Sequence, residues 1–375
     1  MRALVMRCLA VAAIVGGLLT LVLHTEDAST SASEETATRE GRELDDESRP
    51  PGATPATTPT VPPAPVSTRP PTTVAPTIEI VFTGDIIPHD RVNRVGAEVG
   101  FVELFDPEVR NTIAAADLAI CHLEAPVAAG EPEGYPTFNA PIALLAALGE
   151  VGFDGCSTAS NHTLDQGADG AIETVAAFDE LGLEQAGINP DGTLGWASYE
   201  IEGVRFAHLS WTYGLNGFRN PDDNPLLVPT VPFESVDPEG VEIEGILAAA
   251  AAAQVGADHV IVSLHWGAEY RHEPTTAQRA IAERLGASPD VDLLVGHHAH
   301  VIQPHEVIAG THVAFGLGNF LSNNFTACCP EATRYGVIMH ARFGPDGVEV
   351  QWTPTMVDRA TMTVVPADAE VAAIT

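Results

Sequence analysis

The chain has 375 residues and a formal net charge of −34, from 17 basic and 51 acidic residues. All the basic residues are arginines, and from Thr77 onward 11 of them stand against 42 acidic residues, a net charge of −31. Such a surplus repels nucleic-acid phosphates, so we exclude nucleic acid as a partner, and it favours solubility. A polyanionic substrate would need metal ions or arginines to hold it.

The first residues resemble a targeting segment. Arg2 and Arg7 precede the apolar run Cys8–Leu23, a pattern typical of a secretory signal or a signal anchor. No small-x-small cleavage site follows closely, which favours an uncleaved anchor over residues 1–24. The arginines would stay in the cytoplasm, so the pattern predicts a single-pass protein of the cell membrane with an extracytoplasmic domain. The alternative is a cleaved leader and a secreted protein.

Residues 25–76 are rich in Ser, Thr and Glu and then in Pro and Thr. Such a composition cannot bury a core, so we expect a disordered, semi-extended spacer. The remaining residues, 77–375, are numerous enough for one large α/β core.

Apolar runs alternate with helical patterns along this domain. Four runs read as strands, at Ile78–Phe82, Leu118–Cys121, His259–Leu264 and Val291–Val295. Helices are predicted over Pro141–Glu150, Ala168–Leu181, Val241–Gln254 and Thr275–Leu285, the last with Thr275 as N-cap before Gln278. Late strands, at Thr311–Phe315, Tyr335–Phe343 and Val348–Thr353, follow without intervening helices. This order predicts a layered α/β/β/α core rather than a purely parallel sheet.

The five cysteines show no disulfide framework and no zinc knuckle, because no Cys-x-x-Cys occurs. Cys121 and Cys156 end strand-like runs, where buried thiols are common. Cys8 lies in the apolar leader. Cys328 and Cys329 are adjacent in a polar segment, and their connectivity cannot be read from the sequence.

Polar segments follow the four apolar runs, where strand ends build sites in α/β folds. Together with a fifth segment they are Thr83-Gly84-Asp85, His122-Leu123-Glu124, Ser160–Asp165, His265–Tyr270 and Gly296–His300. Carboxylates and imidazoles in such numbers suit Mn, Fe or Zn. A His-x-His pair with single ligands from other strands can hold two metal ions about 3.5–4 Å apart. Alternation along an extended chain puts His298 and His300 on one face and His297 on the other.

In this order the segments, with Gly318-Asn319-Phe320, resemble the CapA family of poly-γ-glutamate capsule synthesis proteins, a branch of the calcineurin-like metallophosphoesterase superfamily. The similarity runs from about Ile78 to Met356. Three residues depart from the family pattern: His122 and Ser160 replace asparagines, and Ala299 replaces a proline. None of them removes a residue expected to bind metal, but they leave the metal preference open.

The resemblance implies two divalent ions, Mn, Fe or Zn, and a role for each site residue. Their ligands would be Asp85, Asn161, His265, His298 and His300, with Glu124 as the bridging carboxylate. His162 would stabilise or protonate the leaving oxygen. Asp165 would either orient His162 or cap the next helix. Outside the family pattern, His89 could add an imidazole, and His122 is either a supporting partner or a surface residue.

The resemblance also implies a membrane-tethered protein of capsule biosynthesis. It would act as a metal-dependent hydrolase on poly-γ-glutamate or another cell-surface polymer. Two alternatives stay open: a non-enzymatic assembly or binding factor of a capsule export complex, with other capsule synthesis proteins as partners, and a general phosphoesterase. A secreted nucleotidase-type phosphatase would need a base-stacking domain, for which the chain has no room.

Overall fold

The computed structural model describes residues 76–231, 243–324 and 329–368. The expected leader, residues 1–24, all but the last residue of the expected spacer, and the cysteines Cys8 and Cys328 lie outside these ranges. Over the described ranges, no helix combines the length and the apolar character needed to cross a membrane.

The first sheet has eight strands. Its order is β14-β13-β12-β1-β2-β3-β4, and β11 pairs with β1 in addition. The strands β1 to β4 are parallel, whereas β12, β13 and β14 continue the sheet antiparallel. Their bounds are β1 Ile78–Ile86, β2 Leu118–Leu123, β3 Gly155–Ser157, β4 Glu184–Ala186, β11 Asn319–Leu321, β12 Tyr335–Gly344, β13 Gly347–Asp358 and β14 Thr363–Pro366.

The second sheet has six strands in the order β5-β6-β7-β8-β10-β9. The four central strands are parallel, and an antiparallel strand closes each edge. The bounds are β5 Ala197–Ile201, β6 Val204–Thr212, β7 His259–His265, β8 Leu293–His297, β9 His305–Ile308 and β10 Thr311–Ala314.

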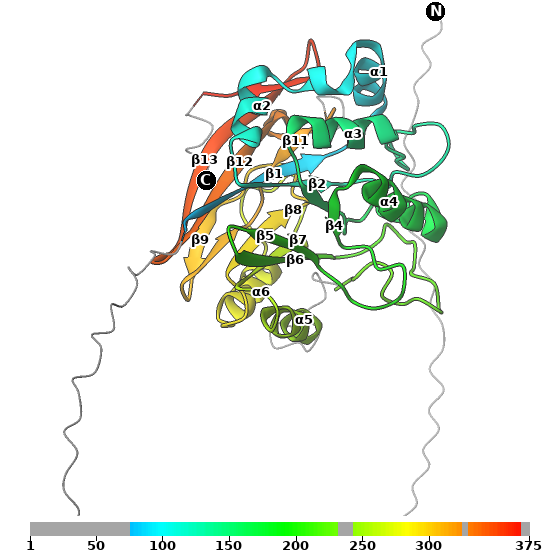
Figure 1. Ribbon diagram of the computed structural model, residues 1–375. Helices are drawn as coiled ribbons and strands as arrows, with labels where there is room; N and C mark the ends of the chain where they lie inside the picture. The colour runs from blue at the N-terminus through cyan, green and yellow to red at the C-terminus, as the bar shows by residue number, and fades with distance from the viewer. Residues whose placement is uncertain (1–75, 232–242, 325–328, 369–375) are drawn as a thin grey trace, which may run out of the picture. The chain divides into compact units, whose positions relative to one another are not determined.

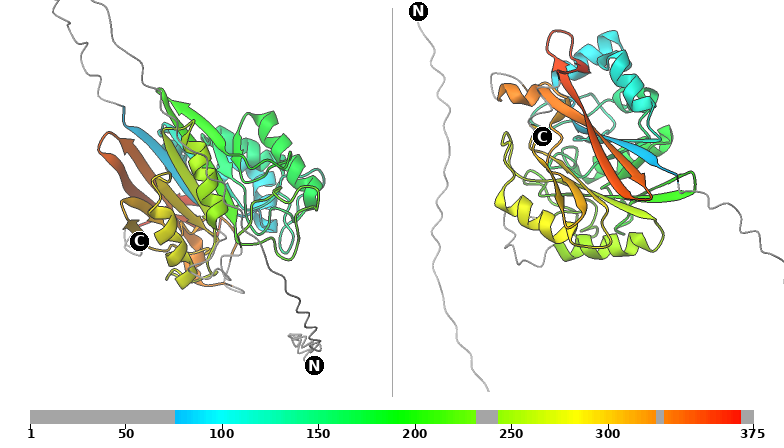
Figure 2. Two further views of the ribbon diagram at one scale, coloured as in Figure 1. Left: turned by 90° about the horizontal axis from the view of Figure 1, so that it is seen from below. Right: turned by 90° about the vertical axis from the view of Figure 1, so that its left-hand side faces the viewer.

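Helices cover the outer face of each sheet (Figures 1 and 2). The first sheet carries α1 Asp90–Val99, α2 Pro107–Ala114, α3 Ile142–Val151 and α4 Gly167–Leu181, and the second carries α5 Glu244–Gln254 and α6 Thr276–Gly286. One apolar cluster fills each helix–sheet interface, and a third, including Phe82, Ile120, Phe206 and Met339, lies between the two sheets. The predicted α/β/β/α layering is confirmed.

The local signals in the sequence are confirmed in the helices. Helix α6 starts directly after Thr275, whose hydroxyl accepts the N–H of Gln278 at 3.1 Å, while the Gln278 side chain accepts the N–H of Thr275 at 2.8 Å. This reciprocal capping box satisfies two backbone donors that the helix start would otherwise leave unpaired.

The expectation that Cys121 and Cys156 are buried thiols is wrong, because the two form a disulfide. They are register partners on the neighbouring parallel strands β2 and β3, with Cα atoms 4.3 Å apart. A single sequence does not say which strands are neighbours, so it could not pair them. Cys329 is disulfide-bonded as well.

Truncating Phe82 tests the packing between the sheets. Its side chain is 1% exposed, and its register partners are Ile120 and Met339. We expect Phe82→Ala to lower the free energy of unfolding by about 3–5 kcal/mol, since it removes a buried ring and leaves a cavity. Urea unfolding measures this. The control Val307→Ala, at a side chain 57% exposed, should stay within about 0.5 kcal/mol of wild type. Equal effects of the two substitutions would contradict the inter-sheet core.

Candidate metal centre

Along three strands, the apolar residues that face the inter-sheet core are followed, on the same face, by polar side chains. Every second residue of a strand faces the same side. On the inter-sheet face, β2 presents Leu118, Ile120 and then His122, β7 presents Ile261, Ser263 and His265, and β8 presents Leu293, Val295 and His297. The three strands therefore end with an imidazole at one place between the sheets.

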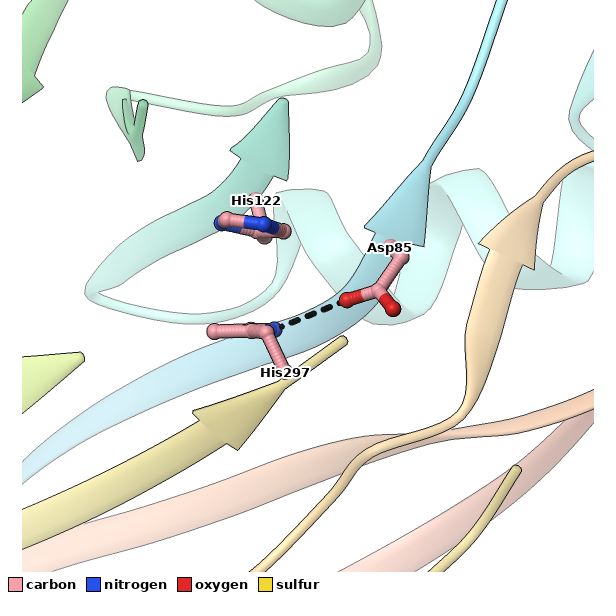
Figure 3. A group of neighbouring side chains, drawn as sticks. All are labelled: Asp85, His122 and His297. Carbon is pink, nitrogen blue, oxygen red and sulfur yellow. Dashed lines mark hydrogen bonds and ion pairs between the residues drawn. The ribbon is translucent and has the colours of Figure 1, made fainter. Parts of the chain in front are cut away.

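The first group of possible metal ligands is Asp85, His122 and His297 (Figure 3). The Asp85 carboxylate and the His297 ring point toward each other, and a hydrogen bond of 3.1 Å joins Oδ1 to Nδ1. The His122 ring stacks on that of His297 with centroids 4.0 Å apart. Ser157 holds the other side of His122 through a 2.8 Å hydrogen bond to Nδ1.

Two further groups of possible ligands continue from the first, each sharing one residue with the group before it. They are His122 with Glu124 and His265, and Glu124 with His298 and His300; within each group the ligand atoms lie within 4.8 Å of one another. Glu124 Oε1 is 3.6 Å from His265 Nε2 and 3.8 Å from His300 Nε2. Because His122 and Glu124 each belong to two groups, the three groups form one continuous buried centre.

The structure thus brings together the six residues that the resemblance assigned as ligands. Asn161 joins through its Oδ1, which lies 2.9 Å from His265 Nε2. His89 is outside the three groups, and its Nδ1 accepts the N–H of Asn323 at 3.1 Å.

The expectation that His297 points away from His298 and His300 is wrong. Alternation holds only in extended chain, and this segment leaves that conformation at His298 (φ 84°) and again at His300 (φ 55°). All three imidazoles therefore reach the centre. His122, left between a supporting and a surface role, is fully buried. Its place two residues after Ile120, on the inter-sheet face, is the signal that could have assigned it.

Gly84 brings the strand that carries Asp85 against the residues before β11. A Cβ at Gly84 would collide with the carbonyl oxygen of Gly318, which itself has a φ of +72°. In return, the N–H of Asp85 donates to that oxygen at 2.9 Å. The next residue, Asn319, hydrogen-bonds His300 Nδ1 through its Oδ1 at 3.1 Å. This close backbone contact thus fixes the distance between β1, which carries Asp85, and β11, which begins with Asn319.

The side chains fit a divalent cation. Glu124 Oε2 and His298 Nδ1 are buried without a hydrogen-bond partner among the described residues. An unpaired buried polar atom costs about 1–3 kcal/mol, which a ligand bond would offset. Carboxylate oxygen, imidazole nitrogen and one amide oxygen form a donor set suited to Mn, Fe or Zn.

The pKa shifts of the buried histidines also favour metal binding. Burial lowers the pKa values of His122 and His265 and lowers that of His298 to about 3, so these rings are neutral and can offer a lone pair. Burial acts in the same direction on His300, but the charges of Glu124 and Asp85 outweigh it and raise the pKa of His300 to about 9. Burial also raises the pKa of Glu124. Ligation by His300 would release the proton that its raised pKa favours.

His162 and Asp165 form a pair at the edge of the centre. Asp165 Oδ2 lies 2.7 Å from His162 Nδ1 and accepts the N–H of Phe138 at 2.7 Å. Helix α4 starts at Gly167 with Gln166 as N-cap and without a side-chain cap, so Asp165 does not cap it. Of the two roles left open by the sequence, the contacts match the orientation of His162. His162 also lines a cavity of about 340 Å³ next to the centre.

Comparison with known proteins gives one family and several relatives. The family model described as "Bacterial capsule synthesis protein PGA_cap" matches residues 79–324. The PGA biosynthesis protein CapA of Bacillus subtilis is 29% identical over 250 residues, 64% of this chain and 62% of that protein. The capsule biosynthesis protein CapA of Bacillus anthracis is 30% identical over 239 residues, 61% of this chain and 55% of that protein. The chain thus spans about three fifths of either relative.

Solved structures give more distant similarities. The calcineurin-like phosphoesterase YfkN from Bacillus subtilis is 12% identical, with a TM-score of 0.40 over 80% of this chain and 95% of that one. A putative 5′-nucleotidase from Staphylococcus aureus is 13% identical, with a TM-score of 0.40 over 80% of this chain and 57% of that one. The family match covers more than half of the chain and includes Asp85, Glu124, Asn161, His265, His298 and His300. The chain belongs to the bacterial PGA_cap capsule synthesis family.

Proposed function

We propose that this protein is a dinuclear metal-dependent hydrolase that acts on a cell-surface polymer, with poly-γ-glutamate as the first candidate. The observation that carries the proposal is the continuity of the three ligand groups, which share His122 and Glu124. Glu124, which belongs to two of the three groups, would be the anion between two such cations. A protein that serves only as a scaffold gains nothing from such a set of buried ligands.

Each ion would take its own share of the ligands. Asp85, His122 and His297 would hold one ion, His298 and His300 the other, and Glu124 would lie between the two. His265 and Asn161 stand beside Glu124 and complete the set. Bound Mn, Fe or Zn ions would polarise a phosphoryl or carbonyl oxygen and lower the pKa of water.

His162 would supply the proton that the leaving group needs. Asp165 accepts a hydrogen bond from His162 Nδ1, and this contact fixes the orientation of the imidazole ring. The ring lines the cavity in which a substrate would lie, and its Nε2 edge can donate to a leaving oxygen or nitrogen. Asp165 is in turn fixed by the Phe138 N–H, so this side chain positions the imidazole before substrate arrives.

We further propose that the domain works outside the cytoplasm, tethered to the membrane by residues 1–24. The support is the arginine-flanked apolar pattern of that segment and the Cys121–Cys156 disulfide. Disulfides form and persist in oxidising compartments and are rare in the cytosol. Residues 25–76 would be the spacer between membrane and domain.

A non-enzymatic role is the second candidate. Relatives from Mycobacterium tuberculosis, 26% identical over 178 residues, are named probable polyglutamine synthesis accessory proteins. A protein of that kind would bind polymer or other capsule synthesis proteins and would hold metal only for structure. Turnover by purified protein separates the two candidates.

Removing a shared ligand tests the metal centre. We expect about two divalent ions per chain in wild type, by analogy with other two-metal sites. His122→Ala should lose most of this metal, because His122 belongs to two ligand groups. Mass spectrometry of the full-length protein measures the content. The control is His340→Ala, since His340 contacts Glu79 and Thr353, outside all three groups. Full metal content in His122→Ala would contradict this ligand assignment.

Removing His162 tests the chemistry separately from the metals. His162→Ala should keep its metal content but lose turnover by about 10²–10⁴-fold, the range of general acid–base catalysis. A generic phosphodiester and poly-γ-glutamate, assayed in parallel, identify the bond. His312→Ala, a change far from the cavity lining, is the control. Metal-loaded wild type without turnover on either substrate would favour the accessory role.

A further inference from the structure

The cavity beside His162 is lined by two carboxylates, Asp165 and Glu269, and by exposed aromatic rings. Its volume is about 340 Å³, and its lining includes Tyr135, Asn161, His162, Asp165, Phe218 and Glu269. A narrower cavity of about 50 Å³, which shares Tyr135, His162 and Glu269, continues to Glu124 and His300 of the metal centre. Among the described residues no arginine lines either cavity, and the sequence contains no lysine.

The aromatic rings lie open to solvent. Tyr135 is 76% exposed and Phe218 43% exposed, unusual values for large apolar rings. The ring centroids of Tyr135 and Phe138 lie 6.5 Å apart, edge to face, and those of Phe138 and His162 lie 4.7 Å apart. Ring contacts therefore lead from the exposed Tyr135 to the imidazole of His162. An aromatic face attracts an ammonium group by about 0.5–2 kcal/mol.

The polar lining offers mainly acceptors. Asp165 Oδ1 has no partner among the described residues, although the side chain is only 1% exposed. Glu269 is an exposed carboxylate in the lining of both cavities. Asn216, with a φ of 49°, accepts Asn161 Nδ2 at 3.2 Å, which holds this amide at the cavity. A phosphate or carboxylate here would face the like charges of Asp165 and Glu269 with no arginine or lysine in the described lining beside it, whereas an N–H donor with positive charge would be matched.

We propose that this cavity binds a primary ammonium group of the substrate, with Glu269 as its counter-charge and Tyr135 and Phe218 flanking it. The inference deepens the proposed hydrolase function and rests on it for the substrate. In poly-γ-glutamate the repeating units carry carboxylates, and the one free ammonium group is at the amino end of the chain. The cavity therefore places that end, rather than the polymer interior, beside the metal centre.

Binding of two matched ligands tests the ammonium group directly. The probes are a γ-linked glutamate trimer with a free amino end and the same trimer N-acetylated. Calorimetry on the metal-loaded, full-length protein measures affinity, and product analysis of the same samples records any turnover. We expect wild type to prefer the free amine about tenfold, equivalent to about 1.4 kcal/mol. Glu269→Gln should abolish this preference. Glu283→Gln, the same loss of charge at an exposed position of α6, should keep it.

Each other outcome contradicts the proposal. Equal affinity of wild type for both trimers would overturn the ammonium site, and a preference that survives Glu269→Gln would remove Glu269 from it. Hydrolysis of both trimers at equal rates by metal-loaded wild type would overturn the site but leave the hydrolase standing. A preference in binding, with no turnover of any substrate, would sink the hydrolase and leave the ammonium site standing.

Discussion

Face-to-face packing of the two sheets holds the metal centre together. Its ligands come from β1 and β2 in one sheet and from β7 and β8 in the other, so no single sheet carries them all. The apolar layer of Phe82, Ile120 and Val295 keeps the sheets in register below the centre. A slip of one residue in β2, β7 or β8 would turn the imidazole of that strand toward the core between sheet and helices.

Besides its proposed role as a metal ligand, Asp85 organises the histidine segment. It receives hydrogen bonds from His297 Nδ1 at 3.1 Å, from the N–H of His298 at 3.2 Å and from His300 Nδ1 at 3.1 Å. Burial would raise the pKa of Asp85, but the bonds from His297 and His300 hold it below its usual range. The anion thereby stabilises a backbone course that non-glycine residues rarely adopt.

The sequence predicts most of the layered fold. Its strand-like apolar runs end in polar segments, and they can be told apart from the stretches with helical periodicity. It also predicts the neighbourhood of Asp85, Glu124, Asn161 and His265, because parallel strands deliver their carboxyl ends to one edge. It does not predict the disulfide, which depends on β2 and β3 being neighbours. It misplaces His297, because the left-handed turn at His298 is stabilised by Asp85, 213 residues away.

The close contact between Gly84 and Gly318 excludes substitution at one position of the centre, whereas other positions can be substituted. His122 and Asn161 contribute to the centre through their side chains alone. Replacing either by another ligand residue could therefore change the preference for one metal over another. Position 84 offers no such freedom, because any side chain there would push the Gly318 carbonyl away and with it the backbone that holds Asn319. Substitutions of side chains could therefore change the metal preference of the proposed centre, whereas the backbone contact between Gly84 and Gly318 has to stay as it is.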